Sequence, residues 1–272
     1  MGFLKRVKNL KLEELAGRRR AKTLDELERE LRARRRAVTG GARVPELLSE
    51  GRPSLSAALR RPGMSLIAEV KRASPARGWL AKGILAEELA ARYEGAGARA
   101  VSVLTEAAFF GGSPEDLKRV RERVNIPVLC KDFIVDPYQI WEAALLGADA
   151  VLLIVRLAGE RLLELLEACE KAGVEALAEV HTAPEIEAAL RAGARLVAVN
   201  CRDLDTLRVH PERHFELGPF LGGGVLTVAA SGVGDALAVG RLWAAGYDGV
   251  LVGEALVTAP DPAAKIAELL SQ

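Results

Sequence analysis

Cysteine and histidine are scarce in this chain of 272 residues, which has three of each. Cys130, Cys169 and Cys201 show no Cys-x-x-Cys spacing and cannot all pair with one another, which favours a reducing, cytoplasmic setting over a disulfide framework. His210 and His214 stand four residues apart in a surface-like segment, and we interpret them as a helix-start or surface pair. The sequence therefore predicts no metal site.

Long apolar runs are also missing. Charged residues interrupt every apolar run well before the roughly 18 residues that a membrane-spanning helix needs. The N-terminal stretch MGFLKRVKNLKLEEL lacks the apolar core and cleavage site of a secretory signal, and Arg6 stands where a myristoylation signal has Ser or Thr. We therefore expect no membrane partner. The scarcity of Asn and Gln suits a heat-stable protein, and an ordinary melting temperature would contradict that hypothesis.

Positive charge is concentrated near the N-terminus. Residues 1–36 carry thirteen Lys and Arg but six Asp and Glu, although the whole chain has a net charge of +1. This distribution permits a basic arm for nucleic acid, but no aromatic interleaving or nucleic-acid motif supports it. We interpret the segment as amphipathic helices that pack on the rest of the protein with a solvated basic face. Their apolar stripe would consist of Leu10, Leu12, Leu15, Leu24, Leu27 and Leu31.

From residue 65 onward, short apolar runs alternate with amphipathic segments. Their Val, Leu, Ile and Ala content is typical of parallel strands buried on both faces. Several intervening segments open with Asp, Ser or Thr before Pro and end in Gly, which are helix start and stop signals. The eight apolar runs are SLIAEV, ARAVSVLTE, IPVLCKDF, ADAVLLIV, EALAEV, RLVAVN, VLTVAAS and DGVLVGEAL.

Eight strand-helix units predict an α/β fold, either a closed barrel or a doubly wound sheet. The first turn, RASPARG, lacks the Gly-x-Gly-x-x-Gly motif of a doubly wound dinucleotide fold. The count of eight favours a (β/α)8 TIM barrel. We expect a single domain, 1–272, with an N-terminal helical extension over 1–64 and the barrel over 65–272.

Polar residues stand at the ends of seven of the eight runs, where a TIM barrel carries its chemistry. Glu69 and Lys71 are two residues apart on a strand, so they point to the same face. Lys131 and Glu179 end two other runs. A lysine in a mostly apolar barrel near another cation loses basicity, and it can then exchange protons near neutral pH. This pattern indicates acid-base catalysis; the alternative is a rim network of salt bridges.

The turns after the seventh and eighth runs, ASGVGD and VGEAL, offer glycines and backbone N–H groups at helix starts. Barrels of this type often bind a phosphate there, and Ser74 in the first turn could reach it. We expect the side chain of Glu254 to point away from such a phosphate, so that its backbone N–H alone would serve. Ordinary tight turns are the alternative interpretation.

Taken together, these motifs resemble the indole-3-glycerol phosphate synthase family over nearly the whole chain. The resemblance depends on an ordered set of segments, of which the short glycine turns are the weakest part. It also covers the basic helical extension before the barrel. The segments are IAEVKRASPARG, VSVLTEAAFFGGS, IPVLCKDFIVDPYQI, GADAVLLIV, LAEVHT, VAVNCRDLDTL, ASGV and VLVGEAL.

The resemblance implies a reaction that needs no cofactor or metal. The ring carbon that bears the carboxylate of 1-(2-carboxyphenylamino)-1-deoxyribulose 5-phosphate attacks the ketone, carbon dioxide leaves, and dehydration gives the indole. Lys131 would be the general acid at the carbonyl oxygen. Lys71, oriented by Glu69, would hold the substrate carboxylate and donate a proton in dehydration. Glu179 would be the base of the last step.

The resemblance also implies how the anionic sugar-phosphate substrate is held. Basic side chains of the N-terminal helix would help to draw it in and cover it. Phe110 and Phe133 would flank the anthranilate ring, as stacking surfaces do. Polar substrate groups would meet Asn200, Arg202 and Ser231, and the phosphate would meet Ser74, Gly232 and Gly253.

One position departs from the family pattern. The family usually has Glu-Ser-Gly at the seventh strand end, and this chain has Ala230 followed by Ser231 and Gly232. We still expect an active enzyme. The rival interpretations are phosphoribosylanthranilate isomerase, which would want a Cys/Asp pair, the α subunit of tryptophan synthase, and a silent sugar-phosphate-binding barrel. The sequence does not determine the oligomeric state, for which we expect a monomer or weak homo-oligomer.

Overall fold

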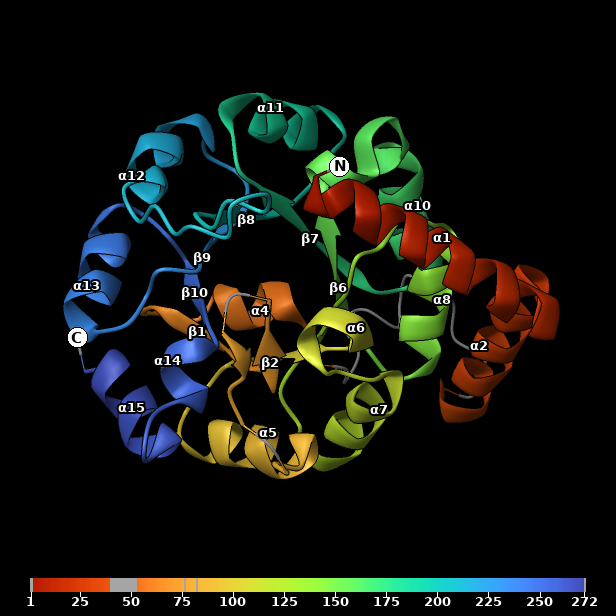
Figure 1. Ribbon diagram of the computed structural model, residues 1–272, viewed down its shortest axis with the longest axis horizontal. Helices are drawn as coiled ribbons and strands as arrows, with labels where there is room; N and C mark the ends of the chain where they lie inside the picture. Colours follow the sequence, from red (N-terminus) through yellow and green to blue (C-terminus); the bar gives the residue numbers. More distant parts are fainter. Residues whose placement is uncertain (1, 40–52, 76, 82, 272) are drawn as a thin grey trace.

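Eight parallel strands form a closed barrel at the centre of the molecule, as the computed structural model shows for the described residues 2–39, 53–75, 77–81 and 83–271 (Figure 1). The predicted TIM barrel is thereby confirmed. Around the ring the strand order is β1-β10-β9-β8-β7-β6-β5-β4. The strands are β1 (Ser65–Val70), β4 (Ala100–Leu104), β5 (Val128–Lys131), β6 (Ala150–Ile154), β7 (Glu175–Val180), β8 (Leu196–Asn200), β9 (Leu226–Ala230) and β10 (Gly249–Val252).

Helices follow the strands and form an outer ring (Figure 1). The longer helices between strands lie in the amphipathic segments that separate the apolar runs, because their apolar stripes pack on the barrel. The helices of the barrel are α5 (Ala86–Gly95), α6 (Ala107–Phe110), α7 (Pro114–Arg123), α8 (Pro137–Leu145), α9 (Val155–Ala158), α10 (Leu162–Ala172), α11 (Ala183–Arg191), α12 (Arg213–Leu217), α13 (Ala236–Ala244), α14 (Glu254–Val257) and α15 (Pro262–Leu269), with short 3-10 turns η1 (Gly159–Arg161) and η2 (Gly218–Phe220).

The predicted helix starts form side-chain caps. Ser113 accepts a hydrogen bond from the backbone N–H of Asp116 at the start of α7, and Asp136 accepts one from Tyr138 at the start of α8. In each case a proline occupies the first turn, where its missing N–H costs nothing. Glycines in the left-handed region, such as Gly173 after α10, end several helices as expected.

Pairing between the first and last strands closes the barrel. Ser65 lies beside Gly249, and Ala68 lies beside Val252, in parallel register. Because adjacent residues of a strand point to opposite faces, the register determines which side chains meet inside the barrel. On β1 the inward set includes Glu69, which is in register with Ser102 of β4.

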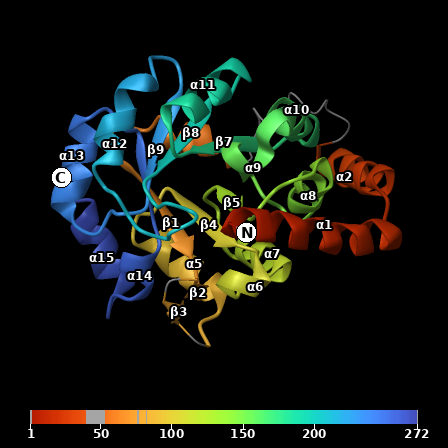
Figure 2. The same cartoon turned by 45° about the horizontal axis from the view of Figure 1, so that its top comes forward.

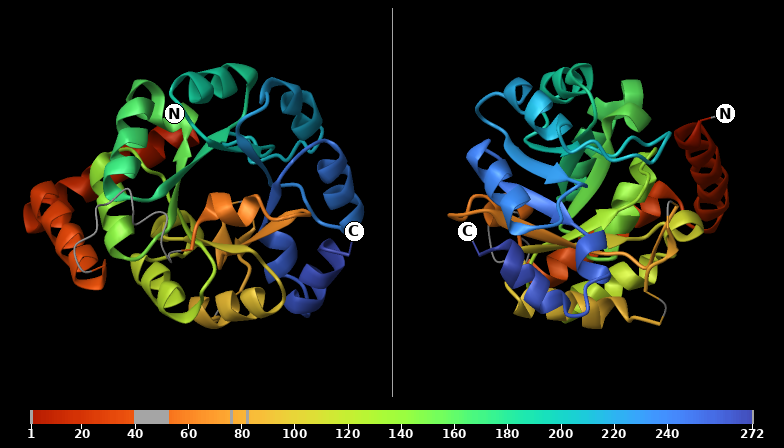
Figure 3. Two further views of the ribbon diagram at one scale, coloured as in Figure 1. Left: turned by 180° about the vertical axis from the view of Figure 1, so that it is seen from behind. Right: turned by 60° about the vertical axis from the view of Figure 1, so that its left-hand side comes forward.

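The N-terminal extension consists of α1 (Phe3–Ala21), α2 (Leu24–Thr39) and α4 (Leu55–Leu59), and part of the expected segment lies outside the described residues. The first helix, α1, runs over the C-terminal ends of the strands near β5, and α2 packs against α8 (Figures 1 and 2). The short helix α4 lies at the opposite end of the barrel (Figure 3). There the Glu175 carboxylate at the start of β7 accepts hydrogen bonds from the first N–H groups of α4.

The predicted apolar stripe of these helices is confirmed in part. Leu15, Leu27 and Leu31 are buried, and Leu4 and Val7 join them. Leu12 is 44% exposed, so its place in the stripe is wrong. The neighbouring residue Lys11 is buried in its place. The spacing of apolar residues alone does not reveal that a lysine takes the buried position.

A short hairpin was not predicted. Strands β2 (Ala73–Ser74) and β3 (Gly78–Trp79) pair in antiparallel fashion within the loop after β1. The hairpin projects beside α6 at the mouth of the barrel, and Ser74 lies on its first strand (Figure 2).

Candidate active site

Glu69 and Lys71 meet at the end of β1, as their spacing predicts. The Lys71 ammonium lies 2.7 Å from Oε1 of Glu69, and both side chains are largely buried. Strand alternation points both into the mouth of the barrel, where they come together with charges from other strands. The pair is therefore part of a larger cluster.

Lys131 links this pair to a second carboxylate. From the end of β5, its Nζ lies 4.0 Å from Oε2 of Glu69 and 3.8 Å from Oε2 of Glu179 at the end of β7. Burial favours the protonated form of Glu69, but the charges of Lys71 and then Lys131 outweigh it and hold the pKa of Glu69 below its ordinary value. Glu69 is therefore an anion at neutral pH, and it faces both lysines.

A pocket of about 490 Å³ opens above this cluster. Its walls combine charged strand ends with apolar side chains from the loops, as a site for an aromatic anion requires. All of the candidate residues from the sequence line it, and their individual roles remain predictions. They are Glu69, Lys71, Ser74, Phe110, Lys131, Phe133, Glu179, Asn200, Arg202, Ser231, Gly232, Gly253 and Glu254.

One wall of the pocket is aromatic. Phe110 and Phe133 lie with ring centroids 6.2 Å apart and ring planes tilted by 41°. Phe3 of α1 meets Phe133 edge-on at 6.0 Å and also lines the pocket. Sequence reasoning missed Phe3, because nothing near it in the chain shows that α1 crosses the mouth.

Glu106 fixes the position of Phe110. Its buried carboxylate accepts hydrogen bonds from the backbone N–H groups of Ala108, Phe109 and Phe110, so it holds the short helix α6 at the end of β4. In the sequence, Thr105 and Glu106 end the second apolar run, and these two polar residues were the only local sign that Glu106 lies at the mouth of the barrel.

The opposite side of the pocket contains the two expected phosphate turns. Ser231 has φ 66° and Gly232 has φ 70°, a left-handed conformation that a serine adopts only under constraint. The Ser231 carbonyl oxygen accepts a hydrogen bond from the Cys201 thiol, with Sγ at 3.4 Å, and it lies 3.3 Å from Nε2 of His214. These contacts hold the carbonyl away from the mouth.

The expectation of a surface histidine pair is wrong for His214. Its side chain is 2% exposed, and burial lowers its pKa to about 4, so that it is neutral at physiological pH. His210 is about one-third exposed and faces Glu212 at 3.3 Å. The fold separates the pair because α12 packs against β8 and directs His214 toward the ring of Tyr247, at 5.9 Å between ring centroids.

Gly253 leaves room for the cluster. A Cβ at this position would lie 2.4 Å from Oε1 of Glu69, a clash with a buried carboxylate. The glycine at the end of β10 therefore serves the charged cluster as well as the predicted phosphate turn.

Glu254 lines the pocket, and neighbouring arginines offset the negative charge of its carboxylate. Its carboxylate lies 3.1 Å from Arg77 of the loop after β1 and 3.9 Å from Arg202. Next to it, Oδ1 of Asn200 accepts a hydrogen bond from the backbone N–H of Arg202. An anion that enters here meets two guanidinium groups and one carboxylate.

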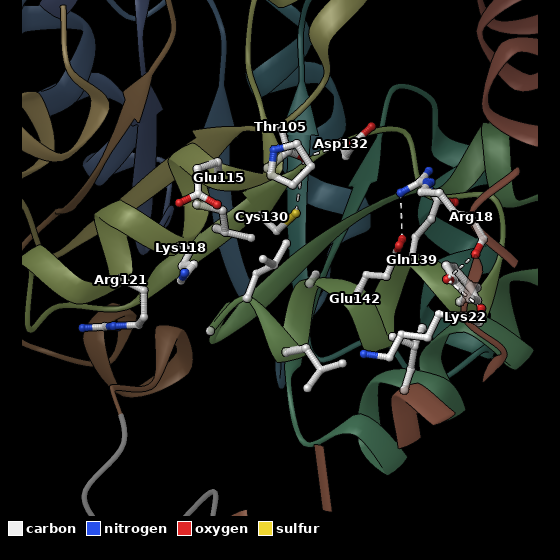
Figure 4. A pocket seen from close by; sticks show the side chains of 18 of the residues that line it. Arg18, Lys22, Thr105, Glu115, Lys118, Arg121, Cys130, Asp132, Gln139 and Glu142 are labelled. Atoms are coloured by element: carbon white, nitrogen blue, oxygen red, sulfur yellow. Dashed lines mark hydrogen bonds and ion pairs between the residues drawn. The ribbon is translucent and has the colours of Figure 1, made fainter. Parts of the chain in front are cut away.

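A second cavity, of about 710 Å³, lies between the N-terminal helices, α7 and α8 (Figure 4). Successive residues at the end of β5 and just after it divide between the two spaces. Cys130 and Asp132 line this cavity, whereas Lys131 lines the pocket. Its charged side chains include the Arg18–Glu142 ion pair, at 2.7 Å. The described residues that line it include none of the candidate site residues.

Within the described part of the chain, no cluster of three or more His, Cys, Asp or Glu side chains is arranged to hold a metal ion. The described helices also include none that is long and apolar enough to span a membrane.

The model of the family described as "Indole-3-glycerol phosphate synthase" matches residues 4–269. A protein of that name from Mycolicibacterium gilvum is 52% identical over 216 residues, which cover 79% of each chain. Another, from Syntrophobacter fumaroxidans, is 46% identical over 256 residues and covers 90% of this chain and 95% of its own. The chain belongs to the indole-3-glycerol phosphate synthase family. By this membership it is a carboxy-lyase of tryptophan biosynthesis.

Solved structures support the fold of this synthase family member. A 3-hexulose-6-phosphate synthase matches with a TM-score of 0.64 at 18% identity and covers 76% of this chain and 99% of its own. A second such synthase, from Salmonella typhimurium, has a TM-score of 0.61, also at 18% identity, over 76% of this chain and 97% of its own. At these identities the likeness supports the barrel alone.

Proposed function

We propose that the pocket converts 1-(2-carboxyphenylamino)-1-deoxyribulose 5-phosphate to indole-3-glycerol phosphate, with release of carbon dioxide and water. The observation that carries this proposal is the cluster of Glu69, Lys71, Lys131 and Glu179, which places two ammonium groups and two carboxylates beside an aromatic wall. Family membership supplies the reaction, and the cluster supplies an acid and a base for it.

The substrate lies with its aromatic ring against Phe110 and Phe133 and its phosphate at the turns of Gly232 and Gly253. Apolar rings stabilise the flat anthranilate group, and glycine turns let backbone N–H groups approach an anion. Ser74, on the hairpin that faces these turns, adds a hydroxyl donor. This orientation brings the ketone between the two ends of the pocket, above Lys131.

Ring closure begins when the ring carbon that bears the carboxylate attacks the ketone carbon. Lys131 gives a proton to the ketone oxygen as the new carbon-carbon bond forms, and carbon dioxide then leaves with its bonding electrons retained by the ring. Lys71 holds the departing carboxylate until this step, and Glu69 at 2.7 Å keeps Lys71 in place. Asn200, Arg202 and Ser231 bind the sugar hydroxyls.

Dehydration completes the indole. The hydroxyl group leaves as water with a proton from Lys71, and Glu179 removes the remaining proton so that the ring becomes aromatic. Glu179 ends β7, which stands opposite β1 in the barrel, and its Oε2 lies 3.8 Å from Nζ of Lys131. The acid and the base therefore act from different strands.

The first test is fluorescence-monitored turnover of this substrate by the wild type, Lys131→Met and Lys171→Met. Lys171 is 68% exposed on α10, so its variant is a control for the loss of one lysine charge. We expect indole formation by the wild type and the control, and a fall in kcat of about 100-fold or more for Lys131→Met, the range of general acid catalysis.

Tight binding of the substrate without turnover by the wild type would instead support a silent sugar-phosphate-binding barrel. Full activity of Lys131→Met would show that the enzyme catalyses the reaction but that Lys131 is not its general acid.

We further propose a cytoplasmic protein that acts as a monomer or weak homo-oligomer and binds no nucleic acid. Three cysteines without disulfides fit a reducing compartment. The basic helix α1 forms ion pairs with carboxylates of the barrel, Lys11 with Asp132 and Arg18 with Glu142. These ion pairs reduce the positive charge that α1 could offer to a nucleic acid. Sedimentation analysis and a salt-dependent gel shift check these points.

A further inference from the structure

Behind Glu179 lies a histidine that the proposed reaction does not use. His181 follows the end of β7 and is 6% exposed. Its Nε2 lies 3.6 Å from Oε1 of Glu179, and its Nδ1 lies 3.5 Å from Oε2 of Glu185. Neither ring nitrogen has a hydrogen bond of normal length, so a buried imidazole stands between two carboxylates with both of its polar atoms directed at them.

The two oxygens of Glu179 face different partners. Oε1 faces the imidazole, whereas Oε2 faces Lys131 at 3.8 Å in the pocket. Any group that holds Oε1 therefore determines how Oε2 is presented to the substrate. The reaction needs this control, because a misplaced base loses most of its effect.

Contacts with a backbone N–H group and with Thr182 anchor Glu185 beside the imidazole. Its carboxylate accepts a 2.7 Å hydrogen bond from the backbone N–H of His181, and its own N–H bonds to the Thr182 hydroxyl at the start of α11. Burial favours protonated Glu185, but the nearby imidazole, the hydrogen bond from the backbone N–H of His181 and the charge of Arg156 outweigh it and hold the pKa of Glu185 below its ordinary value. Glu185 is therefore a fixed anion behind the imidazole.

We infer that His181 is a positioning residue, held by Glu185, that orients the Glu179 carboxylate toward the substrate. The arrangement is that of a base oriented by a third group, with a carboxylate as the base and an imidazole as its holder. Hydrogen bonds of this kind are often long before the substrate binds and shorten in the reacting complex. The inference rests on the proposed role of Glu179.

The test compares steady-state kinetics of the wild type with His181→Ala, His181→Gln and Glu185→Gln. We expect His181→Ala to lower kcat about tenfold or more with KM within about twofold, because binding groups are untouched while the base is misaligned. The side-chain amide of His181→Gln can still donate to Oε1, so this variant recovers most of the rate. Glu185→Gln keeps an oxygen for the backbone N–H but loses its charge, and it has a smaller effect in the same direction.

Two controls separate this role from a structural one. His210→Ala removes a partly exposed histidine outside the pocket, and we expect wild-type kinetics. Thermal melting of each variant shows whether it is folded, and the nearly isosteric His181→Gln keeps the test meaningful if His181→Ala does not fold. Raised KM with unchanged kcat, or equal impairment of the Ala and Gln variants, would overturn the inference.

A Glu179→Gln variant separates a failure of the positioning role of His181 from a failure of the proposed function. If the wild type turns over, Glu179→Gln is inactive and His181→Ala keeps full kcat, the positioning role alone is wrong. If the wild type forms no indole product, the proposed function fails, and the positioning role fails with it.

Discussion

At the scale of single residues, Ala230 is the point where this chain departs from its family pattern. It ends β9, is 3% exposed, and lies in register with Asn200 and Leu251 on the inner face of the barrel. A longer side chain there would extend into the pocket, within the group of strand ends that includes Ser231. The missing carboxylate therefore changes the charge balance around the two lysines.

We predict that Ala230→Glu changes turnover or its pH optimum, because a carboxylate in a largely buried pocket shifts the proton affinity of nearby ammonium groups. The measurement is kcat and kcat/KM against pH for both proteins. Indistinguishable profiles at every pH would refute it. Ala230→Gln is the matched control, since it adds similar volume without charge.

The sequence predicted the candidate site residues on strands because period-two alternation and a barrel together determine where strand ends point. Phe3 and Lys11 escaped prediction for the opposite reason. Their contacts depend on where a helix docks, and many apolar stripes fit the same surface. The burial of His214 was likewise hidden, because its segment is polar and only tertiary packing brings α12 against β8 and His214 against Tyr247.

At the scale of elements, the docking of α1 depends on a buried ion pair. Lys11 Nζ lies 2.9 Å from Oδ1 of Asp132, whose other oxygen accepts a hydrogen bond from Thr105. Burial alone lowers the pKa of Lys11, but the charge and hydrogen bond of Asp132 outweigh it and raise the pKa above its ordinary value. Asp132 directly follows Lys131, so this contact joins the helix to the strand of the proposed acid.

We predict that Lys11→Met lowers the free energy of unfolding by about 1–3 kcal/mol, since it leaves a partly buried carboxylate without its charged partner. Urea denaturation of both proteins measures this difference. The matched control is Lys8→Met on an exposed position of the same helix, which we expect to stay within about 0.5 kcal/mol of the wild type. Equal stability of the two variants would contradict the prediction.

Element prediction succeeded where local signals were strong and failed where short elements interrupt loops. Each of the eight apolar runs contains a strand, and the capped helices α7, α8 and α11 begin within a residue of their Ser, Asp or Thr signals. The eighth run was drawn too long, because Glu254 already opens α14. The β2–β3 hairpin is two residues on each side, too short to show periodicity.

At the scale of the whole molecule, the three thiols are distributed through a closed core. Cys130, Cys169 and Cys201 are free and buried. Burial raises the pKa of Cys130 to about 12 and that of Cys201 to about 11, and it also raises the pKa of Cys169. Thiolates are therefore rare in the folded protein.

We predict that a thiol reagent such as Ellman's reagent leaves the native protein essentially unlabelled at neutral pH and modifies all three cysteines in denaturant, because only the thiolate reacts. Absorbance during labelling measures both rates. Prompt modification of one native thiol would show that the core opens at that position.

Acid should weaken the fold through His214. Its pKa of about 4 in the folded protein lies below the ordinary 6.5, so the unfolded chain binds more protons between these values. We predict that this contribution to stability is complete above about pH 6.5, falls as the pH drops toward 4, and changes no further below it. Urea unfolding of the wild type and His214→Gln across this range measures it, and a constant difference would contradict it.

Heat stability remains a prediction from composition, and a melting temperature decides it. The single-domain division is likewise a prediction. A single cooperative melting transition, seen at the same temperature by circular dichroism and by fluorescence, would support it.

The pairing of β1 with β10 has a consequence for synthesis on the ribosome. Lys71 and Lys131 leave the exit tunnel early, but the neighbour that covers the other edge of β1 is the last strand to emerge. Until then the nascent chain exposes an unpaired strand, which is a template for association with other chains. A message truncated before the codons for β10 thus yields a chaperone client and not a slower enzyme.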